Sequence, residues 1–368
     1  MIINKIKVKT KTKKYLILIG PNIIKNISSI FSNQKMSFEK CLVVVDKNIP
    51  KKFKLNLLKK LKLKKLLIHK FNASEKNKNY KNVDKIHKIL LKNRFNREDC
   101  LISFGGGIVG DVVGFASSTY KRGIKFINIP TTLLAQVDSS IGGKTGINSK
   151  EGKNLVGSFY QPNLVLSDSN FLKTLPKREI VCGYAEILKH SLISDKKFFL
   201  FLNKNALKIL KLKSPFIEKS IYKSCLIKKK IVQKDEKEKN LRKVLNFGHT
   251  FAHAYEAALG YSKKLNHGEA VLLGISSAIK FSFKNKFLNR KEYLFISNHI
   301  KKYKLPHNIN NYFSSNKIKK ILEFMTKDKK NNSQKINLIL LKNIGHPIIN
   351  KSYNKNIISN FFKKKLFN

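Results

Sequence analysis

The chain has 368 residues, enough for one large or two ordinary domains that each bury a sizeable core, and we expect two. Its 76 Lys and Arg against 22 Asp and Glu give a formal net charge of +54, which ordinarily indicates a nucleic-acid or membrane-surface partner. The surplus avoids residues 101–190, where ten basic and six acidic side chains leave a net charge of +4. No basic stripe alternates with aromatic residues as single-strand binding requires, and a codon bias toward A and T produces the same Lys-, Asn- and Ile-rich composition. We therefore expect no nucleic-acid partner and keep polyanion binding as the alternative.

The predicted location follows from the cysteines and from the lack of targeting segments. The N-terminus has neither the apolar core nor the cleavage site of a signal peptide, and no apolar stretch approaches the roughly 20 residues of a membrane span. The four cysteines are widely spaced without a C-x-x-C pair, as expected for buried thiols in a reducing compartment: Cys41, Cys100, Cys182 and Cys225. We expect a cytoplasmic protein that does not associate with membranes.

The first half of the chain alternates short apolar runs with polar or helical segments, which predicts an α/β domain with a mainly parallel sheet. The predicted strands cover residues 15–19, 41–45, 66–69, 101–104, 126–129 and 164–167. After Pro176 apolar residues recur every three or four positions, which predicts an all-α second domain with helices over residues 179–193, 216–234, 250–259 and 269–283. The Lys-rich segments 51–65 and 327–335 are expected to be solvated faces or loops.

A glycine-rich segment follows the strand predicted at residues 101–104. We expect Gly105, Gly106 and Gly107 to form a turn with positive φ before a helix over residues 111–118, an arrangement that binds phosphate through exposed N–H groups and the helix dipole. The G-x-G-x-x-G spacing to Gly110 is a weak signal for a dinucleotide, because such turns also occur without a ligand. No acidic residue follows about 20 residues later, and the candidate acid, Asp46, lies upstream, so a bound dinucleotide implies a non-standard α/β arrangement.

Candidate metal ligands lie in the helical half. Glu186 and Lys189 share one face of a predicted helix, where a surface ion pair is the simpler interpretation. Further along, Asn246, His249 and His253 form one helical stripe, and His267-Gly-Glu269 follows. Imidazoles and a carboxylate from separate helices can form a three-ligand Zn²⁺ site, although two histidines four residues apart also occur in ordinary helices. With a dinucleotide nearby, such a metal polarises a substrate hydroxyl while nicotinamide takes the adjacent hydride.

Six segments resemble, in order and approximate spacing, the 3-dehydroquinate synthase family of sugar-phosphate cyclases. They read GGGIVGDVVGF, IPTTLLAQVDSSIGGKTGIN, GKNLVGSFYQP, YAEILKH, LNFGHTFAHAYE and HGEAV. The resemblance implies a Rossmann-like NAD-binding α/β domain (residues 1–178), a helical metal- and substrate-binding domain (residues 179–368), an active site in the cleft between them, and a homodimer. It also implies conversion of 3-deoxy-arabino-heptulosonate 7-phosphate into 3-dehydroquinate and phosphate, a lyase step of the shikimate pathway.

The resemblance also implies residue roles. Glu186, His249 and His267 correspond to the ligands of a Zn²⁺ or Co²⁺ ion. Residues expected to contact NAD are Asp46, Glu75, Lys78, Gly106, Gly107, Ile108, Val109, Gly110, Asp111, Thr131, Thr132, Asp138, Lys144, Lys153, Phe171, Leu172, Lys173, Thr174 and Glu179. Residues expected to contact substrate are Lys144, Asn154, Lys189, Lys228, Glu238, Arg242, Asn246 and His253, with Arg122 reaching across the dimer and one of Lys329 and Lys330 facing the substrate. The chain departs from the family pattern at Ser74, where a glycine usually precedes the glutamate.

These residue types suit the family's reaction, in which NAD transiently oxidises a ring hydroxyl, phosphate is eliminated, the hydride returns, and ring opening with aldol closure follows. Lys144, Asn154, Arg122 and His253 suit the leaving phosphate. Arg242 and Lys228 suit the substrate carboxylate, and because of them we favour an acid substrate.

Simpler interpretations and other functions stay open at this point. Lys153 can be a loop lysine, Glu238 a surface acid in a charged run, and Thr131-Thr132 a helix cap. His299, His307 and His346 belong to no motif and are expected in the core or on the surface. The alternatives are another sugar-phosphate cyclase with a neutral substrate, a metal-dependent polyol dehydrogenase, and a basic nucleic-acid-binding protein on a degenerate enzyme scaffold.

Overall fold

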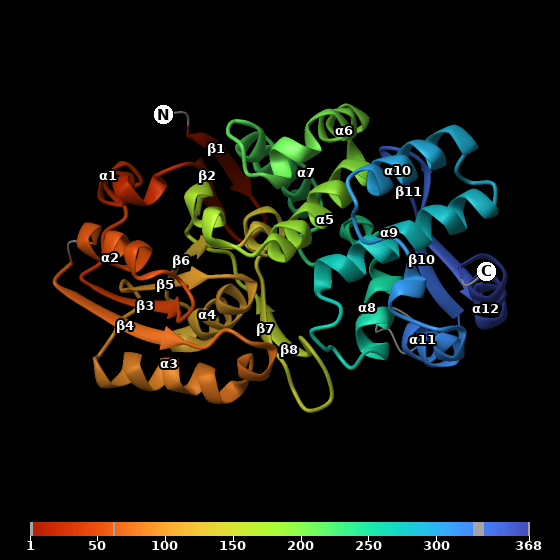
Figure 1. Ribbon diagram of the computed structural model, residues 1–368. Coiled ribbons are helices and arrows are strands. Elements are labelled where there is room, and N and C mark those ends of the chain that lie inside the picture. The colour runs from red at the N-terminus through yellow and green to blue at the C-terminus, as the bar shows by residue number, and fades with distance from the viewer. Residues whose placement is uncertain (1–2, 62, 327–334, 367–368) are drawn as a thin grey trace. The chain divides into compact units, whose positions relative to one another are not determined.

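The computed structural model describes residues 3–61, 63–326 and 335–366 (Figure 1). The chain divides into two compact units, one made of Met1–Pro176 and Ser214–Lys237 and the other of Lys177–Lys213 and Glu238–Asn368. No helix among the described residues combines the length and the apolar character that crossing a bilayer demands.

The first unit is built on a seven-stranded sheet in the order β1-β2-β9-β6-β5-β3-β4. β1 pairs antiparallel with β2, and every other neighbouring pair is parallel. The strands are β1 (Asn4–Lys9), β2 (Lys14–Gly20), β3 (Lys40–Asp46), β4 (Lys65–Phe71), β5 (Cys100–Gly105), β6 (Lys125–Pro130) and β9 (Leu164–Asp168). All six apolar runs expected as strands are strands, and the predicted α/β class is confirmed.

Helices cover both faces of this sheet, which explains why its central strands are apolar almost without alternation. Along β3, Val43 packs in a cluster with α1 and α2, while Val44 packs in a second cluster with α3 and α4. The helices of this unit are α1 (Ile27–Asn33), α2 (Lys51–Lys60), α3 (Tyr80–Lys92), α4 (Gly107–Thr119) and α7 (Phe216–Lys234). A small hairpin of β7 (Lys144–Ile147) and β8 (Val156–Phe159) adjoins α4, as the short distance from a Cβ built on Gly114 to Thr145 Cγ2, 2.5 Å, shows.

The glycine segment after β5 is built differently from our expectation. Gly105 ends the strand, Gly106 precedes α4 with a φ of −74°, and Gly107 already opens the helix, so the predicted positive-φ turn is wrong. The requirement for glycine is steric instead. A Cβ on Gly105 would lie 2.4 Å from Val109 Cγ2, and a Cβ on Gly107 would lie 3.0 Å from Ser139 Oγ.

The segment Ser214–Lys237 returns to the first unit through buried polar contacts. Glu236 accepts hydrogen bonds from Thr12 Oγ1 (2.5 Å) and Gln161 Nε2 (2.7 Å), and Glu218 accepts one from Ser169 Oγ (2.7 Å). The change of periodicity after Pro176 does not anticipate this return, because the apolar pattern of α7 is the same whichever unit the helix joins.

The second unit is mainly helical and also contains a β-hairpin. Its helices are α5 (Lys177–Ser194), α6 (Lys196–Leu210), α8 (His249–Ala258), α9 (His267–Lys284), α10 (Arg290–Lys302), α11 (Ile318–Thr326) and α12 (Lys355–Phe361). The hairpin joins β10 (Lys335–Asn343) to β11 (His346–Asn354) and packs on α9, so the expectation of an all-α domain is corrected there. Of the Lys-rich segment at 327–335, only Lys335 lies within the described residues, and it opens β10.

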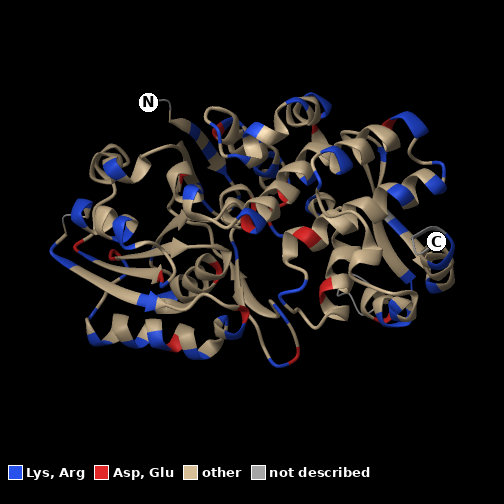
Figure 2. Cartoon of the chain, viewed as in Figure 1, with Lys and Arg blue, Asp and Glu red and all other residues tan. Residues whose placement is uncertain are grey.

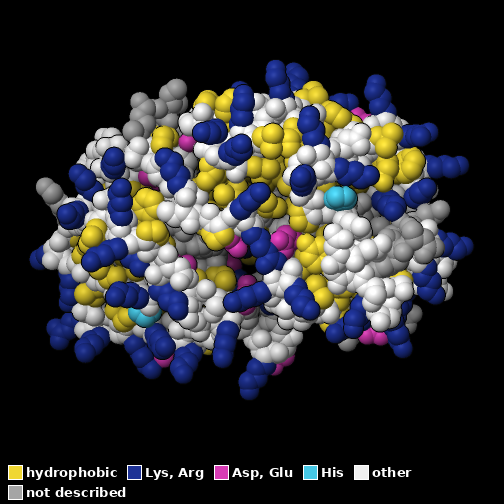
Figure 3. Space-filling model, in the orientation of Figure 1, with side chains coloured by type: hydrophobic (Ala, Val, Ile, Leu, Met, Phe, Trp, Pro, Cys, Tyr) yellow, Lys and Arg dark blue, Asp and Glu magenta, His cyan; other side chains and the backbone are white. Residues whose placement is uncertain are grey.

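Basic side chains are spread over both units. Figure 2 shows Lys and Arg on helices and connecting segments throughout the chain, and on the face seen in Figure 3 they stand singly among other side chains. On the visible face, this distribution favours a compositional origin of the charge over a basic surface that binds nucleic acid.

One histidine without a motif, His299, lies in the core of the second unit. The Tyr184 hydroxyl donates to Nε2 (3.0 Å), and Nδ1–H donates to Asn203 Oδ1 (3.0 Å), an arrangement that only the neutral ring satisfies. Burial, with a contribution from Lys302, lowers the pKa of His299 to about 4.

We expect His299 to make stability pH-dependent. The pKa of His299 in the folded protein lies below the unfolded value near 6.5. The stabilisation that the neutral ring provides is therefore complete above pH 6.5 and is lost as the pH falls toward 4. Between pH 7.5 and 5 the free energy of unfolding, measured with urea, should therefore fall by about 2 kcal/mol more in the wild type than in His299→Gln. Equal losses in the two proteins would contradict the assignment.

Candidate active site

Three helices of the second unit approach closely because glycines line their contacts. Gly248, just before α8, has a φ of 79°, and a Cβ there would lie 2.8 Å from the backbone N of Ile275 in α9. A Cβ on Gly274 would lie 2.2 Å from Gly248 O, and one on Gly268 would lie 2.2 Å from Cys182 Cα in α5. Side chains at these positions would separate α5, α8 and α9.

The start of α9 is fixed by a capping box. Asn266 Oδ1 accepts from the Glu269 backbone N–H, and Glu269 Oε2 accepts from the Asn266 N–H, each at 2.9 Å. Glu269 also pairs with Arg178 of α5 (2.5 Å), whose guanidinium donates to the backbone oxygens of residues 263 and 264. His267, the first residue of α9, is therefore held in a defined place.

These contacts bring Glu186 of α5, His249 of α8 and His267 of α9 together. One ligand atom from each lies within 4.8 Å of the others. His249 Nε2 is 3.4 Å from Glu186 Oε1, and His267 Nε2 is 3.7 Å from the same oxygen. Ligand atoms of a tetrahedral zinc site lie about 3.4 Å apart, given bonds of about 2.0–2.2 Å, so the spacing suits a metal ion.

Hydrogen bonding leaves the metal-facing atoms available. His249 Nδ1–H donates to Phe247 O (3.2 Å), and His267 Nδ1 contacts Glu256 Oε2 (3.3 Å), so both Nε2 atoms face Glu186. Glu186 is fully buried; its Oε2 forms an ion pair with Lys189, and its Oε1, which faces both imidazoles, has no close hydrogen-bond partner among the described residues. A divalent cation satisfies such a carboxylate and accepts both imidazoles, and we conclude that the donor set fits a metal.

The electrostatics of the cluster agree with that fit. Burial opposes ionisation of Glu186, but Lys189 and the two imidazoles hold its pKa well below the usual range. Burial and Lys189 lower the pKa of His249, which keeps that ring neutral and able to bind metal. Burial also opposes protonation of His267, yet its bonds to Glu186 and Glu256 raise its pKa to about 10, and a cation can take the place of that proton.

Other predicted residues of the second unit lie close by in sequence or space. Lys189 is buried and forms an ion pair with Glu186, so it is not the surface pair considered from the sequence. The His253 ring lies 5.4 Å from that of His249 and 6.4 Å from that of His267. Arg242 is 2 % exposed.

The charged run around Glu238 is also more ordered than a solvated surface. Asn246 Nδ2 donates to Glu238 Oε1 (2.8 Å), and Glu238 is only partly exposed. Glu179 lies in the first turn of α5, in the second unit, whereas the other expected NAD contacts are in the first. Lys329 and Lys330 lie outside the described residues.

In the first unit the expected NAD contacts gather at one edge of the sheet. Because β4, β3, β5, β6 and β9 are parallel neighbours, their carboxyl ends share an edge, where α/β sheets bind ligands. The residues that follow these ends are Glu75 and Lys78 after β4, Asp46 at the end of β3, Gly106–Asp111 after β5, Thr131, Thr132 and Asp138 after β6, and Phe171–Thr174 after β9. The Thr132 hydroxyl accepts from Ala135 N (3.2 Å), so a local capping role coexists with any ligand role.

Lys78 connects several of these groups. It is 4 % exposed, and its Nζ lies 2.5 Å from both Asp111 Oδ2 and Asn154 Oδ1. Burial raises the pKa of Asp111, with Lys78 acting in the opposite direction. Glu75 is more exposed, lies 3.8 Å from Lys153 Nζ, and accepts from Asn148 Nδ2 (2.8 Å).

A second buried lysine, Lys228 of α7, is an expected substrate contact and bonds to Asp138, an expected NAD contact. Its Nζ lies 2.7 Å from Asp138 O and 2.6 Å from Asp138 Oδ1. Lys144 opens β7 and Arg122 lies in the short turn after α4, and both are exposed. Arg122 has a φ of 63°, in the left-handed region, which a side chain with a Cβ adopts only where its surroundings hold it.

Comparison with known proteins identifies the family. A profile described as 3-dehydroquinate synthase N-terminal matches residues 68–182, and one described as 3-dehydroquinate synthase C-terminal matches residues 183–331. A 3-dehydroquinate synthase of Pelagibacter ubique is 60% identical over 362 residues, which are 98% of each chain.

The chain belongs to the 3-dehydroquinate synthase family.

The predicted family and activity are thereby confirmed, and solved structures agree on the fold. A 2-deoxy-scyllo-inosose synthase complexed with carbaglucose-6-phosphate, NAD⁺ and Co²⁺ superposes with a TM-score of 0.88 at 23% identity, covering 98% of this chain and 100% of the other. A 2-epi-5-epi-valiolone synthase from Streptomyces hygroscopicus with NAD⁺ and Zn²⁺ bound gives a TM-score of 0.83 at 24% identity, covering 95% and 96%. A parallel-sheet unit and a mainly helical unit are thus the arrangement of this synthase chain.

The sequence reasoning missed Glu256 as a site residue. It follows His249 by seven positions and His253 by three, on the same stripe of α8, and this spacing was the available signal. Glu256 is buried and contacts the ring nitrogen of His267 that does not face Glu186. Carboxylates in this position orient a metal-binding imidazole.

We expect His249→Ala to abolish retention of Zn²⁺ while leaving NAD affinity nearly unchanged, because one of three ligands is lost and the nucleotide edge of the sheet is untouched. Metal content after gel filtration, measured by atomic emission, tests this. The control is His346→Ala, which removes an exposed histidine at the start of β11. Full metal content in His249→Ala would show that the ligand assignment is wrong.

We expect Glu256→Gln to lower Zn²⁺ affinity by about tenfold and Glu256→Ala by up to about 100-fold, because His267 loses its orienting carboxylate. Competition with a calibrated chelator measures this without any turnover. The smaller effect of the glutamine variant is expected because its carbonyl oxygen still accepts from Nδ1–H. An unchanged affinity in both variants would assign Glu256 to packing alone.

Proposed function

We propose that this chain converts 3-deoxy-arabino-heptulosonate 7-phosphate into 3-dehydroquinate and phosphate as an NAD- and metal-dependent lyase of the shikimate pathway. The observation that carries the proposal is the buried Glu186, His249 and His267 cluster on three helices, in a chain of this family. The solved relatives hold NAD⁺ with Co²⁺ in one case and Zn²⁺ in the other, so we propose NAD with either ion. The proposed location is the cytoplasm.

NAD, when bound, supplies a transient oxidation of a ring hydroxyl and the return of the same hydride, while the metal ion polarises that hydroxyl. In the proposed assignment the carboxyl edge of the sheet holds the dinucleotide. The N-terminus of α4, with Gly106 and Gly107, offers backbone N–H groups to the pyrophosphate, and a Cβ on either glycine would crowd Thr132 (3.1 Å) or Ser139 (3.0 Å).

The proposed phosphate subsite consists of cationic and amide groups. Lys144, Asn154 and His253 bind the phosphate of the substrate, and Arg122 of a second copy completes the set in a homodimer. Asn154 already accepts from Lys78, which places a positive charge beside its carboxamide. Hydrogen bonds from charged donors stabilise phosphate as it leaves, and its own oxygens take up protons, so few side chains need to act as bases.

The proposed carboxylate subsite uses Arg242 and Lys228, with Lys189, Asn246, Glu238 and one of Lys329 and Lys330 on the ring hydroxyls. Arg242 is buried, and a buried guanidinium binds a carboxylate with two parallel bonds at low desolvation cost to the protein. We assign NAD binding to residues 1–178 and metal binding to residues 179–368, as the family resemblance implies.

We expect purified protein to release phosphate from the heptulosonate phosphate with catalytic NAD and Zn²⁺, to lose this activity with a chelator, and to recover it when metal is restored. A sugar phosphate lacking the carboxylate should react with a kcat/KM about 100-fold or more lower, because about 3 kcal/mol of charged hydrogen bonding is lost. No phosphate under any condition would refute the proposal. Equal rates for the two substrates would favour a cyclase with a neutral substrate.

A further inference from the structure

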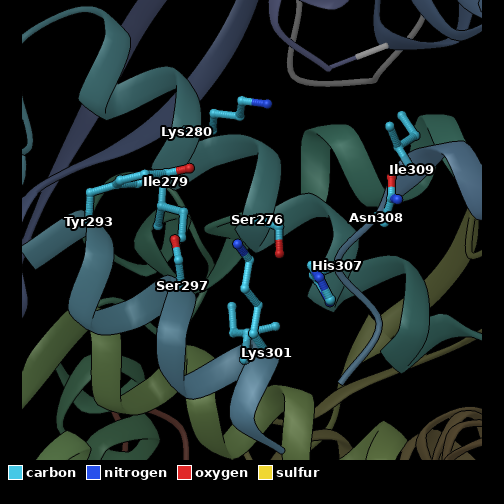
Figure 4. A pocket seen from close by; sticks show the side chains of 10 residues that line it. Ser276, Ile279, Lys280, Tyr293, Ser297, Lys301, His307, Asn308 and Ile309 are labelled. Carbon is cyan, nitrogen blue, oxygen red and sulfur yellow. The ribbon is translucent and has the colours of Figure 1, made fainter. Parts of the chain in front are cut away.

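A polar pocket of about 280 Å³ lies in the second unit between α9, α10 and the segment that follows α10 (Figure 4). From α9 it is lined by Ser276, Ile279 and Lys280, from α10 by Tyr293, Ser297, Ile300 and Lys301, and from the following segment by His307, Asn308 and Ile309. None of the predicted metal, NAD or substrate residues is among them.

The pocket lining contains basic side chains and no carboxylate. Lys280, Lys301 and His307 line it, and no acidic side chain does. Lys301 forms no ion pair with any described acidic residue, and Figure 4 shows its side chain extending from α10 into the pocket. The lining therefore favours an anion.

Ser276 differs from the other serines of the same helix. Ser277 and Ser282 donate to carbonyls one turn earlier, at 2.9 Å and 2.8 Å, as serines inside helices commonly do. Ser276 Oγ is buried and has no hydrogen-bond partner among the described residues. A buried hydroxyl without a partner is costly, and a ligand oxygen in the pocket removes that cost.

His307 is oriented by the backbone so that one ring nitrogen remains for a ligand. Its Nδ1–H donates to Leu305 O (2.8 Å), which leaves Nε2 uncommitted by that bond. Ile279, Ile300 and Ile309 supply an apolar wall beside these polar groups. A few convergent polar groups on an apolar wall are typical of small-molecule sites.

We propose that this pocket binds a small organic oxyanion, with its phosphate or carboxylate head between Lys301, Ser276 and His307 and its carbon body against the three isoleucines. The volume accommodates a phosphate with a short carbon body. The site is separate from the metal cluster and does not depend on the proposed catalytic function.

Amine labelling of the full-length protein tests the proposal, with inorganic phosphate as the probe. Acetylation of each lysine is followed by mass spectrometry in phosphate and in chloride at equal ionic strength, so that screening is the same. With a Kd at or below about 5 mM, phosphate at about 10 mM slows labelling of Lys301 at least about threefold, since protection follows one plus the ratio of ligand concentration to Kd. Lys302, the next residue on α10, is the internal control and should label at an unchanged rate.

One variant and a second probe separate the pocket from general charge. Ser276→Ala removes a hydroxyl that bonds to no described residue, so the protein should fold normally while protection of Lys301 falls. Phenyl phosphate should protect Lys301 more strongly than inorganic phosphate, because its ring reaches the apolar wall. Equal slowing at Lys301 and Lys302, or protection that survives in Ser276→Ala, would overturn the proposal.

Discussion

The close approach of α5, α8 and α9 is the constraint on which the candidate active site depends. Gly248, Gly268 and Gly274 sit where any Cβ would meet backbone within 3 Å, and that approach places a fully buried carboxylate beside two imidazoles. An isolated buried carboxylate is strongly destabilising, so Glu186 needs the positive charge around it. The site is therefore assembled by packing and stabilised by electrostatics, and neither is sufficient alone.

The first unit combines groups that the sequence assigned to different partners. Lys78 binds both Asp111, an expected cofactor residue, and Asn154, an expected substrate residue. Lys228 reaches Asp138 because α7 returns to this unit. Expected substrate contacts therefore lie in the first unit, bonded to expected cofactor contacts, as well as in the second.

Much of the fold followed from local patterns. Continuous apolar runs identified the six parallel-sheet strands because both faces of that sheet are covered, and α7 was predicted with its observed bounds, residues 216–234. The conformation of Gly105 to Gly107 was wrong because a glycine required for close packing has the same sequence signal as one required for positive φ. The hairpin of β10 and β11 and the placement of α7 depend on contacts between distant residues, which periodicity does not contain.

For the site, ordered motifs named the candidate residues, and the structure supplies the geometry that motifs lack. Spacing along α8 suggests that His249 and His253 share a face, but it does not show how closely Glu186 and His267, which lie on other helices, approach His249. The same spacing places Glu256 on that stripe, but it does not reveal the role of Glu256, which depends on the direction of the His267 ring.

In a chain so rich in lysine, burial distinguishes the cationic side chains that we assign to a site from those that only reflect the composition. A drift toward A- and T-rich codons adds lysines wherever they stay solvated, because burying an unpaired ammonium costs several kcal/mol. Among the described residues the Lys and Arg side chains classed as buried are Lys78, Lys189, Lys228 and Arg242. Each of these four residues was assigned to cofactor or substrate contacts from the family motifs alone. Codon drift does not account for a lysine or arginine at a position where the side chain loses its contact with water. Selection for a charge at that place does account for it, and Lys78, Lys189 and Lys228 each form an ion pair with a carboxylate of another candidate site residue.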